Sequence, residues 1–427
     1  MPITFFAHRL GTDHCESVSV MDMNGDGRLD ILSGAYWYEN PGAAGGPWAR
    51  HQFREVPLTG EFVDDCAEYL IDVNKNGRLD LVTSSWQRDG IWWYENPGKA
   101  DVMWQPHKIC SSIDTEGMVI GDLMGTGKNQ DLLACHYNSN GLIWVNFSGP
   151  EPVAHQVGAR LPLPPRPAPR GGAAGRRGGP GRRGPQWPTS LGQGDGHGVG
   201  IGDIDGDGKN DILTRHGWFK NIDASQNKWE FRPEWELKEE AGFPMIVYDV
   251  DGNGRPDVIY GNGHGYGLFW LEQLGNGTWR QHLIDDSVSQ VHAIAMADLD
   301  GDGQLELIAG KRYRADPNEG QYDPLAIHYY KLDRGTQRFT RFPISYNGTA
   351  EVGTTIIPVD IDGDGDLDIV VGGKTGVHWI ESYRIGNPGP RDAVRDKELL
   401  LNYDWPFPGE GTSVTQQSAP VDDSTPL

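Results

Sequence analysis

The chain has 427 residues and a formal net charge of −23 at pH 7, and it is rich in glycine and tryptophan. No run of about 20 apolar residues is present, which excludes a predicted membrane-spanning helix. The four cysteines, Cys15, Cys66, Cys110 and Cys135, lack C-x-x-C spacing, which argues against a zinc cluster or a disulfide framework. We expect Cys15 and Cys66 to be small core residues.

A short acidic loop recurs along the chain, with oxygen-bearing side chains at its positions 1, 3, 5 and 9. A glycine at position 6 permits a sharp turn, and position 7 offers its main-chain carbonyl. This pattern suits a hard cation that takes roughly 6 to 8 oxygen ligands, and it predicts calcium sites. The predicted ligands are Asp22, Asn24, Asp26 and Asp30; Asp72, Asn74, Asn76 and Asp80; Asp203, Asp205, Asp207 and Asp211; Asp249, Asp251, Asn253 and Asp257; Asp298, Asp300, Asp302 and Glu306; and Asp360, Asp362, Asp364 and Asp368.

A seventh, degenerate copy begins at Asp122 and closes one residue late, on Asp131. Met124 and Thr126 replace the oxygen ligands at positions 3 and 5, so this loop is predicted to stay empty. The chain is therefore expected to bind about six structural Ca²⁺ ions, which would cancel roughly twelve negative charges.

The first three loops begin at residues 22, 72 and 122, a period of about 50 residues that is typical of a β-propeller. In the first unit, an apolar strand (18–21) precedes the loop and a second strand (31–33) follows it. An aromatic strand (36–39) and a fourth strand (48–53) complete the unit. Four strands in each of seven units predict an all-β, seven-bladed propeller of four-stranded antiparallel blades over residues 1–385.

The two ends of this region predict how the ring closes. Residues 3–9 match the fourth strand of the other units, whereas the last unit stops after its third strand, at 376–380. We expect the N-terminal strand to complete the last blade and to cover its open edge.

Two segments lie outside the repeat. Residues 158–190 contain seven Arg and eight Pro with no acidic residue, which predicts a flexible insertion between blades 3 and 4. A role in binding a polyanion is the less favoured alternative, and no nucleic-acid partner is expected. The tail, 386–427, is predicted to be mostly irregular. No signal peptide precedes the first strand, and the expected location is extracellular or periplasmic.

The D-x-[DN]-x-D-G loops with a following apolar strand resemble FG-GAP/VCBS repeats, the units of integrin-α-type propellers. The W-Y-E-N-P strands (Trp37–Pro41 and Trp93–Pro97) are more similar to the N-terminal propeller of aldos-2-ulose dehydratase and related sugar-processing proteins. That enzyme also carries cupin domains, which this chain lacks, so its isomerase activity is not expected here. The resemblance implies a calcium-binding propeller with a carbohydrate-related function.

A candidate site follows from the repeat itself. In each blade the first strand runs along the central channel, so the residues before it gather on the face opposite the acidic loops. Residues two apart on a strand point to one side. Eight positions before each loop Asp lie His14, Asp64, Asp114, Asp195, Ala241, Gln290 and Val352; six positions before it lie Glu16, Cys66, Glu116, His197, Phe243, His292 and Thr354.

The hairpins between the second and third strands share this face and add further polar residues. The catalytic candidates are His14, Glu16, Glu116, His136, His197, His216, His264, His292, Lys311, Arg312, Tyr313 and Lys374. By contrast, His8, His51, His107, His155 and His282 recur at one place on the fourth strands. We interpret these five as scaffold residues that bond across blades.

The polar face suggests a metal-assisted reaction. His197 and His292, with His14 or His216 and with Glu16 or Glu116, are expected to hold Zn²⁺ or Mn²⁺. Such an ion polarises a sugar carbonyl or carboxylate, and a nearby His or Tyr then removes the α-proton. Lys311, Arg312 and Lys374 would bind anionic groups, and residues 313–323 would form a lid.

The leading hypothesis is therefore a lyase or dehydratase that acts on a sugar or oligosaccharide. The alternative is a non-catalytic, adhesion-type propeller that binds a glycan or a protein. A third interpretation, a scaffold protein without a pocket, requires side chains to fill the channel mouth. The first hypothesis needs histidines that converge on one point.

Overall fold

In a computed structural model of the chain, the structure describes residues 3–42, 45–59, 62–111, 113, 115–135, 141–158, 197–315, 319–384 and 412–413. Nearly all of the predicted insertion (158–190), and the predicted tail apart from 412–413, lie outside the described residues. Within the described part, no helix is both long and apolar enough to cross a membrane.

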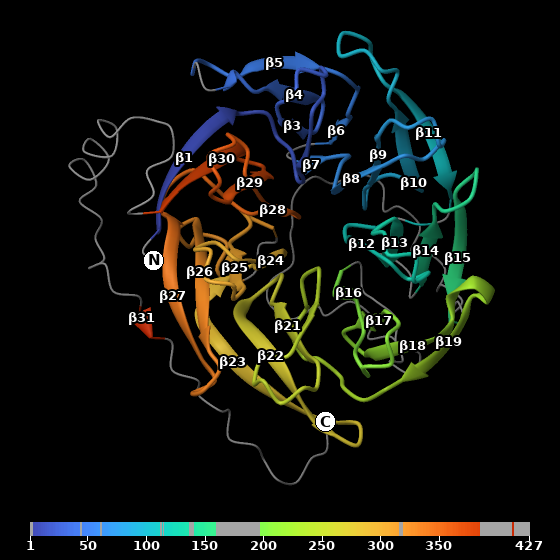
Figure 1. The fold of residues 1–427 in the computed structure, drawn as a ribbon, viewed down its shortest axis with the longest axis vertical. Coiled ribbons are helices and arrows are strands. Elements are labelled where there is room, and N and C mark those ends of the chain that lie inside the picture. Colours follow the sequence, from blue (N-terminus) through green and yellow to red (C-terminus); the bar gives the residue numbers. More distant parts are fainter. Residues whose placement is uncertain are drawn as a thin grey trace, which may run out of the picture.

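Seven antiparallel sheets surround a common centre, and the strand that precedes the acidic loop is the innermost strand of each sheet (Figure 1). Blade 1 comprises β2 (Ser19–Met21), β3 (Asp30–Ser33), β4 (Tyr36–Glu39) and β5 (Ala49–Gln52). Blade 2 comprises β8 (Ala67–Ile71), β9 (Asp80–Ser84), β10 (Ile91–Glu95) and β11 (Gln105–Cys110). Blade 3 comprises β12 (Met118–Gly121), β13 (Asp131–Cys135), β14 (Leu142–Asn146) and β15 (Val153–Val157).

Blade 4 comprises β16 (Val199–Gly202), β17 (Asp211–Thr214), β18 (Gly217–Asp223) and β19 (Lys228–Arg232), with the 3-10 turn η2 (Ala224–Gln226) between the last two. Blade 5 comprises β20 (Ile246–Tyr248), β21 (Asp257–Gly261), β22 (Tyr266–Gly275) and β23 (Thr278–Ser289). Blade 6 comprises β24 (Ile294–Ala297), β25 (Glu306–Gly310), β26 (Ala326–Asp333) and β27 (Arg338–Tyr346). The short strand β31 (Thr412–Ser413) pairs with β27, an element that the sequence analysis did not include.

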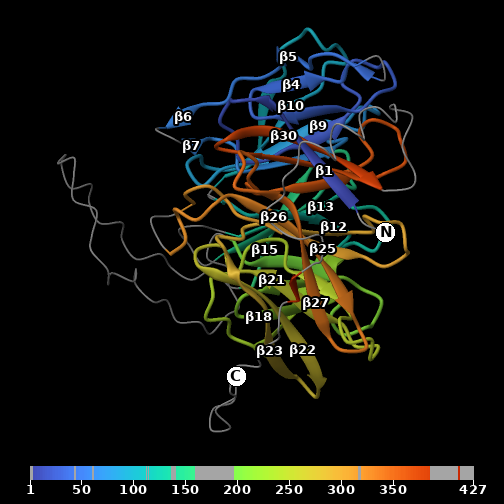
Figure 2. The ribbon, with the colours of Figure 1, turned by 90° about the vertical axis from the view of Figure 1, so that its left-hand side faces the viewer.

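Blade 7 confirms the predicted closure of the ring. Its strands β28 (Ile356–Val359), β29 (Asp368–Gly373) and β30 (Gly376–Arg384) are completed by β1 (Ile3–Gly11). The first strand of the chain thus pairs antiparallel with the last strand of the ring, from Ile3 opposite Arg384 to Gly11 opposite Val377. A separate hairpin, β6 (Leu58–Thr59) with β7 (Phe62–Val63), lies between blades 1 and 2 and projects to one side (Figure 2).

The hydrophobic core is divided among the interfaces between neighbouring blades. One cluster joins blades 2 and 3 through Val82, Leu132 and Val145, and another joins blades 6 and 7 through Ile308, Ile327 and Ile369. Because both faces of an inner strand are covered by adjacent blades, most residues of these strands are apolar. Cys15 and Cys66 are free and buried, as expected for core residues.

The recurring histidines are scaffold residues, but their partners lie within their own blade. Each imidazole stacks on the third-strand Trp of the same sheet, at centroid distances from 4.4 Å for His51 on Trp37 to 4.7 Å for His107 on Trp93. The predicted bonding across blades is therefore wrong. Adjacent antiparallel strands bring the opposing side chains closer together than the neighbouring sheets do.

Candidate functional site

The residues that precede the first strands form a buried ring at one end of the channel. Side chains six positions before each loop Asp are all buried, although five of the seven are polar: Glu16, Cys66, Glu116, His197, Phe243, His292 and Thr354. Buried polar groups of this kind need hydrogen-bond partners, counter-charges or ligands. This ring is the polar face that the sequence analysis identified.

Three imidazoles converge on this face. His197 precedes β16, His292 precedes β24, and His264 lies in the hairpin between β21 and β22. The ring centroids are 4.7 Å apart for His197 and His264, 5.0 Å for His264 and His292, and 5.6 Å for His197 and His292. One ligand atom from each ring lies within 4.8 Å of the others, which is compatible with a single metal ion. We call these residues the histidine cluster.

Each ring of the histidine cluster is oriented by an acceptor at its Nδ1. The Nδ1 of His197 lies 2.7 Å from the carbonyl oxygen of Ala241, and that of His292 lies 3.3 Å from the carbonyl of Gln290. The Nδ1 of His264 is bound to the Glu240 carboxylate. A histidine that binds a metal through one nitrogen usually donates its other N–H to a carbonyl or a carboxylate, as here. The Nε2 of His292 is buried and has no hydrogen-bond partner.

Local sequence explains how these rings are brought together. Asn262 turns the β21–β22 hairpin by accepting a hydrogen bond from the His264 backbone N–H at 3.2 Å. Gly242 admits the neighbouring backbone, since a Cβ there would lie 2.4 Å from the carbonyl oxygen of His292. A Cβ built on Gly263 would lie 3.5 Å from the ring of His292. Gly242 and Asn262 therefore help to place His264 beside the buried His292.

Burial and charge keep the two deeper rings neutral. Burial lowers the pKa of His197, and the nearby His264 lowers it further. Burial also lowers the pKa of His292 well below its ordinary value, with a further contribution from Arg312. Neutral imidazoles are the form that binds a metal. The hydrogen bond from His264 lowers the pKa of Glu240 to about 2, so this carboxylate stays ionised.

Arg312 lies next to the histidine cluster and is almost fully buried, with 2% of its side chain exposed. Its Nε and Nη2 donate to Glu16 Oε2 at 3.1 and 2.8 Å, and its Nη1 donates to Glu116. Glu16 and Glu116 therefore bind Arg312 and are not arranged as metal ligands, contrary to expectation. Arg312 is likewise not presented to an anionic substrate, because two carboxylates already take its donors.

Burial raises the pKa of Glu116, but Arg312 and the nearby His197 and His264 outweigh it, and the pKa falls to about 2. The Arg312 guanidinium stays charged between its two acids. Arg312 thus lies between its two acids, and the histidine cluster lies next to it. The cluster is accessible to solvent on the side of His264 and Glu240, whose side chains are 15% and 50% exposed.

The remaining candidates do not belong to the histidine cluster. Lys311 donates to the Gln290 side chain at 3.2 Å and to the carbonyl of Gly320, and Lys374 donates to the carbonyl of Arg314 at 3.1 Å. His216 bonds Glu236 at 2.8 Å, and His14 is exposed. His264 takes the third place in the histidine cluster, where His14 or His216 was expected. The Tyr313 backbone N–H bonds Glu351, and His136 lies outside the described residues.

The sequence analysis missed three residues that support this face. Glu240 orients His264 and lies in the linker before β20. This linker position does not recur in the other blades, so the repeat could not identify it. Gln290 has a positive φ of 53° and holds both Lys311 and the Ala315 N–H on its side-chain oxygen. Glu351 is fully buried, and burial raises its pKa to about 7. Only Gln290 had a sequence signal, because it is a polar residue eight positions before the first Asp of its loop.

The acidic loops lie at the other end of the strands. In the first loop, Asp22 accepts hydrogen bonds from the N–H groups of Gly25 and Gly27 at 2.7 and 2.8 Å. Asp30 closes the loop by accepting from Met23 and Asn40 at 2.9 and 2.8 Å. In blades 4 to 7, three carboxylates of each loop offer oxygens within 4.8 Å of one another, which fits a divalent cation. In the degenerate loop, by contrast, Met124 packs against the core cluster of blades 3 and 4.

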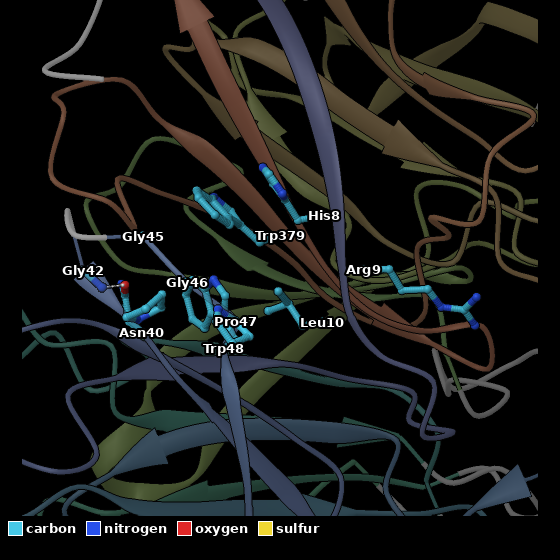
Figure 3. Close-up of a pocket in the computed structure, with 11 residues that line it drawn as sticks. His8, Arg9, Leu10, Asn40, Gly42, Gly45, Gly46, Pro47, Trp48 and Trp379 are labelled. Atoms are coloured by element: carbon cyan, nitrogen blue, oxygen red, sulfur yellow. Dashed lines mark hydrogen bonds between the residues drawn. The ribbon is translucent and has the colours of Figure 1, made fainter. Parts of the chain in front are cut away.

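A cavity of about 330 Å³ lies elsewhere, between blades 7 and 1 (Figure 3). Trp48 and Trp379 form part of its wall, with ring centroids 5.6 Å apart. His8 stacks on Trp379 at 4.5 Å, while the side chain of Arg9 points away from the two indoles. This cavity was not expected from the sequence.

The chain is distantly similar to several solved structures. Among solved structures, a lectin of Agrocybe aegerita that recognises non-reducing terminal N-acetylglucosamine aligns over 87% of this chain and 86% of its own, at 15% identity and a TM-score of 0.44. A rhamnogalacturonan lyase of Bacillus licheniformis aligns over 88% of this chain and 72% of its own, at 14% identity and a TM-score of 0.43. Likenesses this distant carry no argument about activity.

No curated protein sequence matched the chain. A sequence model of the FG-GAP-like repeat matches residues 249–309, from the acidic loop of blade 5 to β25 of blade 6. The chain therefore carries the FG-GAP-like repeat expected from its sequence, within a seven-bladed β-propeller.

Proposed function

We propose that this protein is a metal-dependent lyase or dehydratase that acts on carbohydrate, with its centre at the histidine cluster and with structural calcium in acidic loops of the ring. One observation carries the proposal: three imidazoles from three blades converge, and each is oriented by an acceptor at its Nδ1. The buried His292 Nε2 without a partner supports it, because an unsatisfied buried polar group costs about 1–3 kcal/mol. A metal ion would satisfy that nitrogen.

The ligand set favours Zn²⁺ or Mn²⁺, because neutral imidazole suits these ions better than calcium. When bound, such an ion polarises a carbonyl or carboxylate oxygen, which acidifies the α-proton and favours β-elimination. The chain itself supplies the orientation: Glu240 fixes the His264 ring, and Arg312 holds Glu116 next to the cluster. Two ionised carboxylates nearby compensate the charge of a divalent ion.

Carbohydrate as the substrate class is supported by exposed aromatic residues on the same face. Tyr266 follows His264 in the blade 5 hairpin, and its hydroxyl donates to Asp323 at 2.7 Å. Tyr322, in the segment between β25 and β26, is 82% exposed, and Tyr313 is partly exposed. Aromatic faces beside an opening provide apolar surfaces against which a sugar ring packs.

The test is metal analysis of the purified protein after mild chelation that removes calcium. We expect one tightly held zinc or manganese per chain, which is lost in His264→Ala and in His292→Ala. The same variants should lose the formation of unsaturated product from uronate-containing oligosaccharides while their unfolding midpoint changes little. His51→Ala is the matched control, and it should keep the metal and lose stability instead. Variants of the histidine cluster that unfold easily but keep metal and turnover would show that these imidazoles are only structural.

A second candidate, a glycan-binding protein without catalysis, is favoured by the cavity between blades 7 and 1. Trp48 and Trp379 line it together with Asn40, and its volume suits a single sugar residue. Calorimetric titration with monosaccharides separates the candidates. Binding that is lost in Trp48→Ala but kept in His292→Ala would support the glycan-binding candidate.

A further inference from the structure

One position on the third strand of each blade lies beside the acidic loop of that blade. The strand registers make Glu39 of blade 1 equivalent to Lys220 of blade 4 and to Lys331 of blade 6. The other blades have no cation at this position, where the equivalent residues are Glu95, Asn146, Glu272 and Glu381. Two of the seven blades therefore replace an acidic or neutral residue by lysine.

Where the position is occupied by Glu, the carboxylate contacts the histidine of the fourth strand. In blades 1 and 2 it also accepts a hydrogen bond from the Asn at position 3 of the loop, Glu39 from Asn24 at 3.3 Å and Glu95 from Asn74 at 3.0 Å. Glu39 lies 3.0 Å from His51, and Glu272 lies 2.7 Å from His282. Blades 4 and 6 lack this histidine, because Arg232 pairs with Trp218 in blade 4 and Phe342 pairs with Tyr329 in blade 6. In the two blades with lysine, the fourth-strand histidine that contacts this position in other blades is therefore absent.

In both blades the lysine instead places its positive charge on the carboxylates of the loop. Lys220 Nζ donates to Asp207 at 2.7 Å and also to Asp205. Lys331 Nζ donates to Asp300 and lies 3.8 Å from Asp302 and 3.9 Å from Glu306. These acids occupy positions 3, 5 and 9 of their loops, where a divalent cation would be bound. In blade 1, by comparison, Arg28 contacts a single loop carboxylate, and its Nε is bound to the carbonyl of Asn40.

We propose that Lys220 and Lys331 are built-in cations that occupy the loops of blades 4 and 6, so that these two loops do not take calcium. A lysine ammonium offers three N–H donors and one positive charge to the oxygens that calcium needs. A divalent ion in the same loop would have to displace the ammonium or bind beside a like charge. The chain then binds about four calcium ions, from six intact loops less two. This inference does not depend on the histidine cluster.

Equilibrium dialysis of the full chain against calcium measures the number of bound ions directly. We expect about four ions per chain in the wild type, one more in Lys220→Met and in Lys331→Met, and two more in the double variant. Methionine keeps the apolar stem and removes the charge. Lys228→Met, on an exposed position of β19, changes the net charge equally and should leave the count unchanged. About six ions in the wild type, or a count unchanged in both single variants, would overturn the proposal; a gain in only one variant would overturn it for the other loop.

A second measurement uses the wild-type chain and so does not depend on how the variants fold. Acetylation followed by mass spectrometry reports the accessibility of each ammonium. Lys220 and Lys331 should react several-fold more slowly than Lys228, with the same rates in excess calcium and in excess chelator. Rates that rise on addition of calcium would mean that the ion displaces the lysines, contrary to the proposal.

Discussion

The ion pair between Arg312 and Glu116 allows a quantitative prediction for Glu116→Gln. The pKa of Glu116 falls from its ordinary value of 4.5 to about 2 in the folded protein, because Arg312 and the nearby histidines outweigh the effect of burial. Since each tenfold change in an ionisation constant is worth about 1.4 kcal/mol, the ionised carboxylate stabilises the fold by about 3 kcal/mol at neutral pH. Glutamine retains the shape but not the charge, so this contribution should be lost.

The sign of the pH dependence follows from the depressed pKa. The stabilisation by Glu116 is fully present above about pH 4.5 and disappears as the pH falls toward 2, where the folded protein also protonates the group. Urea unfolding should therefore show a deficit of about 3 kcal/mol for Glu116→Gln at pH 7 and a much smaller one near pH 2.5.

The control for this experiment is Glu230→Gln, whose partner Arg232 lies 3.1 Å away at an exposed site. An exposed ion pair contributes about 0–1 kcal/mol, so this variant should unfold almost like the wild type at both pH values. A deficit for Glu116→Gln that is below about 1 kcal/mol at pH 7, or equal at both pH values, would refute the electrostatic reasoning.

Three further predictions concern stability. Removing calcium with a chelator should lower the unfolding midpoint, and excess calcium should restore it, because an ion at about 100 times its Kd adds about 2.7 kcal/mol per site; an unchanged midpoint would contradict calcium in the loops. Gly353→Ala should lower the free energy of unfolding by more than about 3 kcal/mol or prevent folding, because a Cβ there would lie 2.2 Å from the Glu16 carbonyl oxygen. Gly149→Ala is the control and should be tolerated, because a Cβ there would lie 3.6 Å from its nearest atom. His282→Ala should cost about 1 kcal/mol in urea unfolding, because it loses a stack of 4.4 Å on Trp270 and its bond to Glu272, and an unchanged midpoint would argue against this stabilising role.

The architecture could be predicted from the sequence because each blade repeats the same local signals. An apolar strand, an acidic turn such as Asp22 to Asp30 and an aromatic strand recur at a nearly constant period, and each signal depends only on near neighbours along the chain. The unpaired last blade and the matching first strand then required the ring to close through β1.

The candidate site could be predicted only in part. The repeat placed His197 and His292 at equivalent positions before their first strands, so their location on one face could be expected. It could not show that Arg312 would reach Glu16 and Glu116, because those contacts depend on how far each side chain extends across the centre. Nor could it show Lys220 and Lys331 over their loops, since periodic signals describe what the blades share and not where one blade departs from the others.

The pairing of β1 with β30 has a consequence for how the protein is made. Ile3 meets Arg384, so a ribosome must synthesise nearly the whole ring before the first strand finds its partner. Throughout that time β1 is an unpaired strand whose backbone N–H and C=O groups have no partner strand. Unpaired strands of this kind associate with other chains. Closing so long a segment is also slow, because contacts between distant residues form only after the entropy of the intervening chain has been lost. Fusing a bulky partner directly to the amino terminus should therefore hinder maturation more than substitutions within the intermediate blades do.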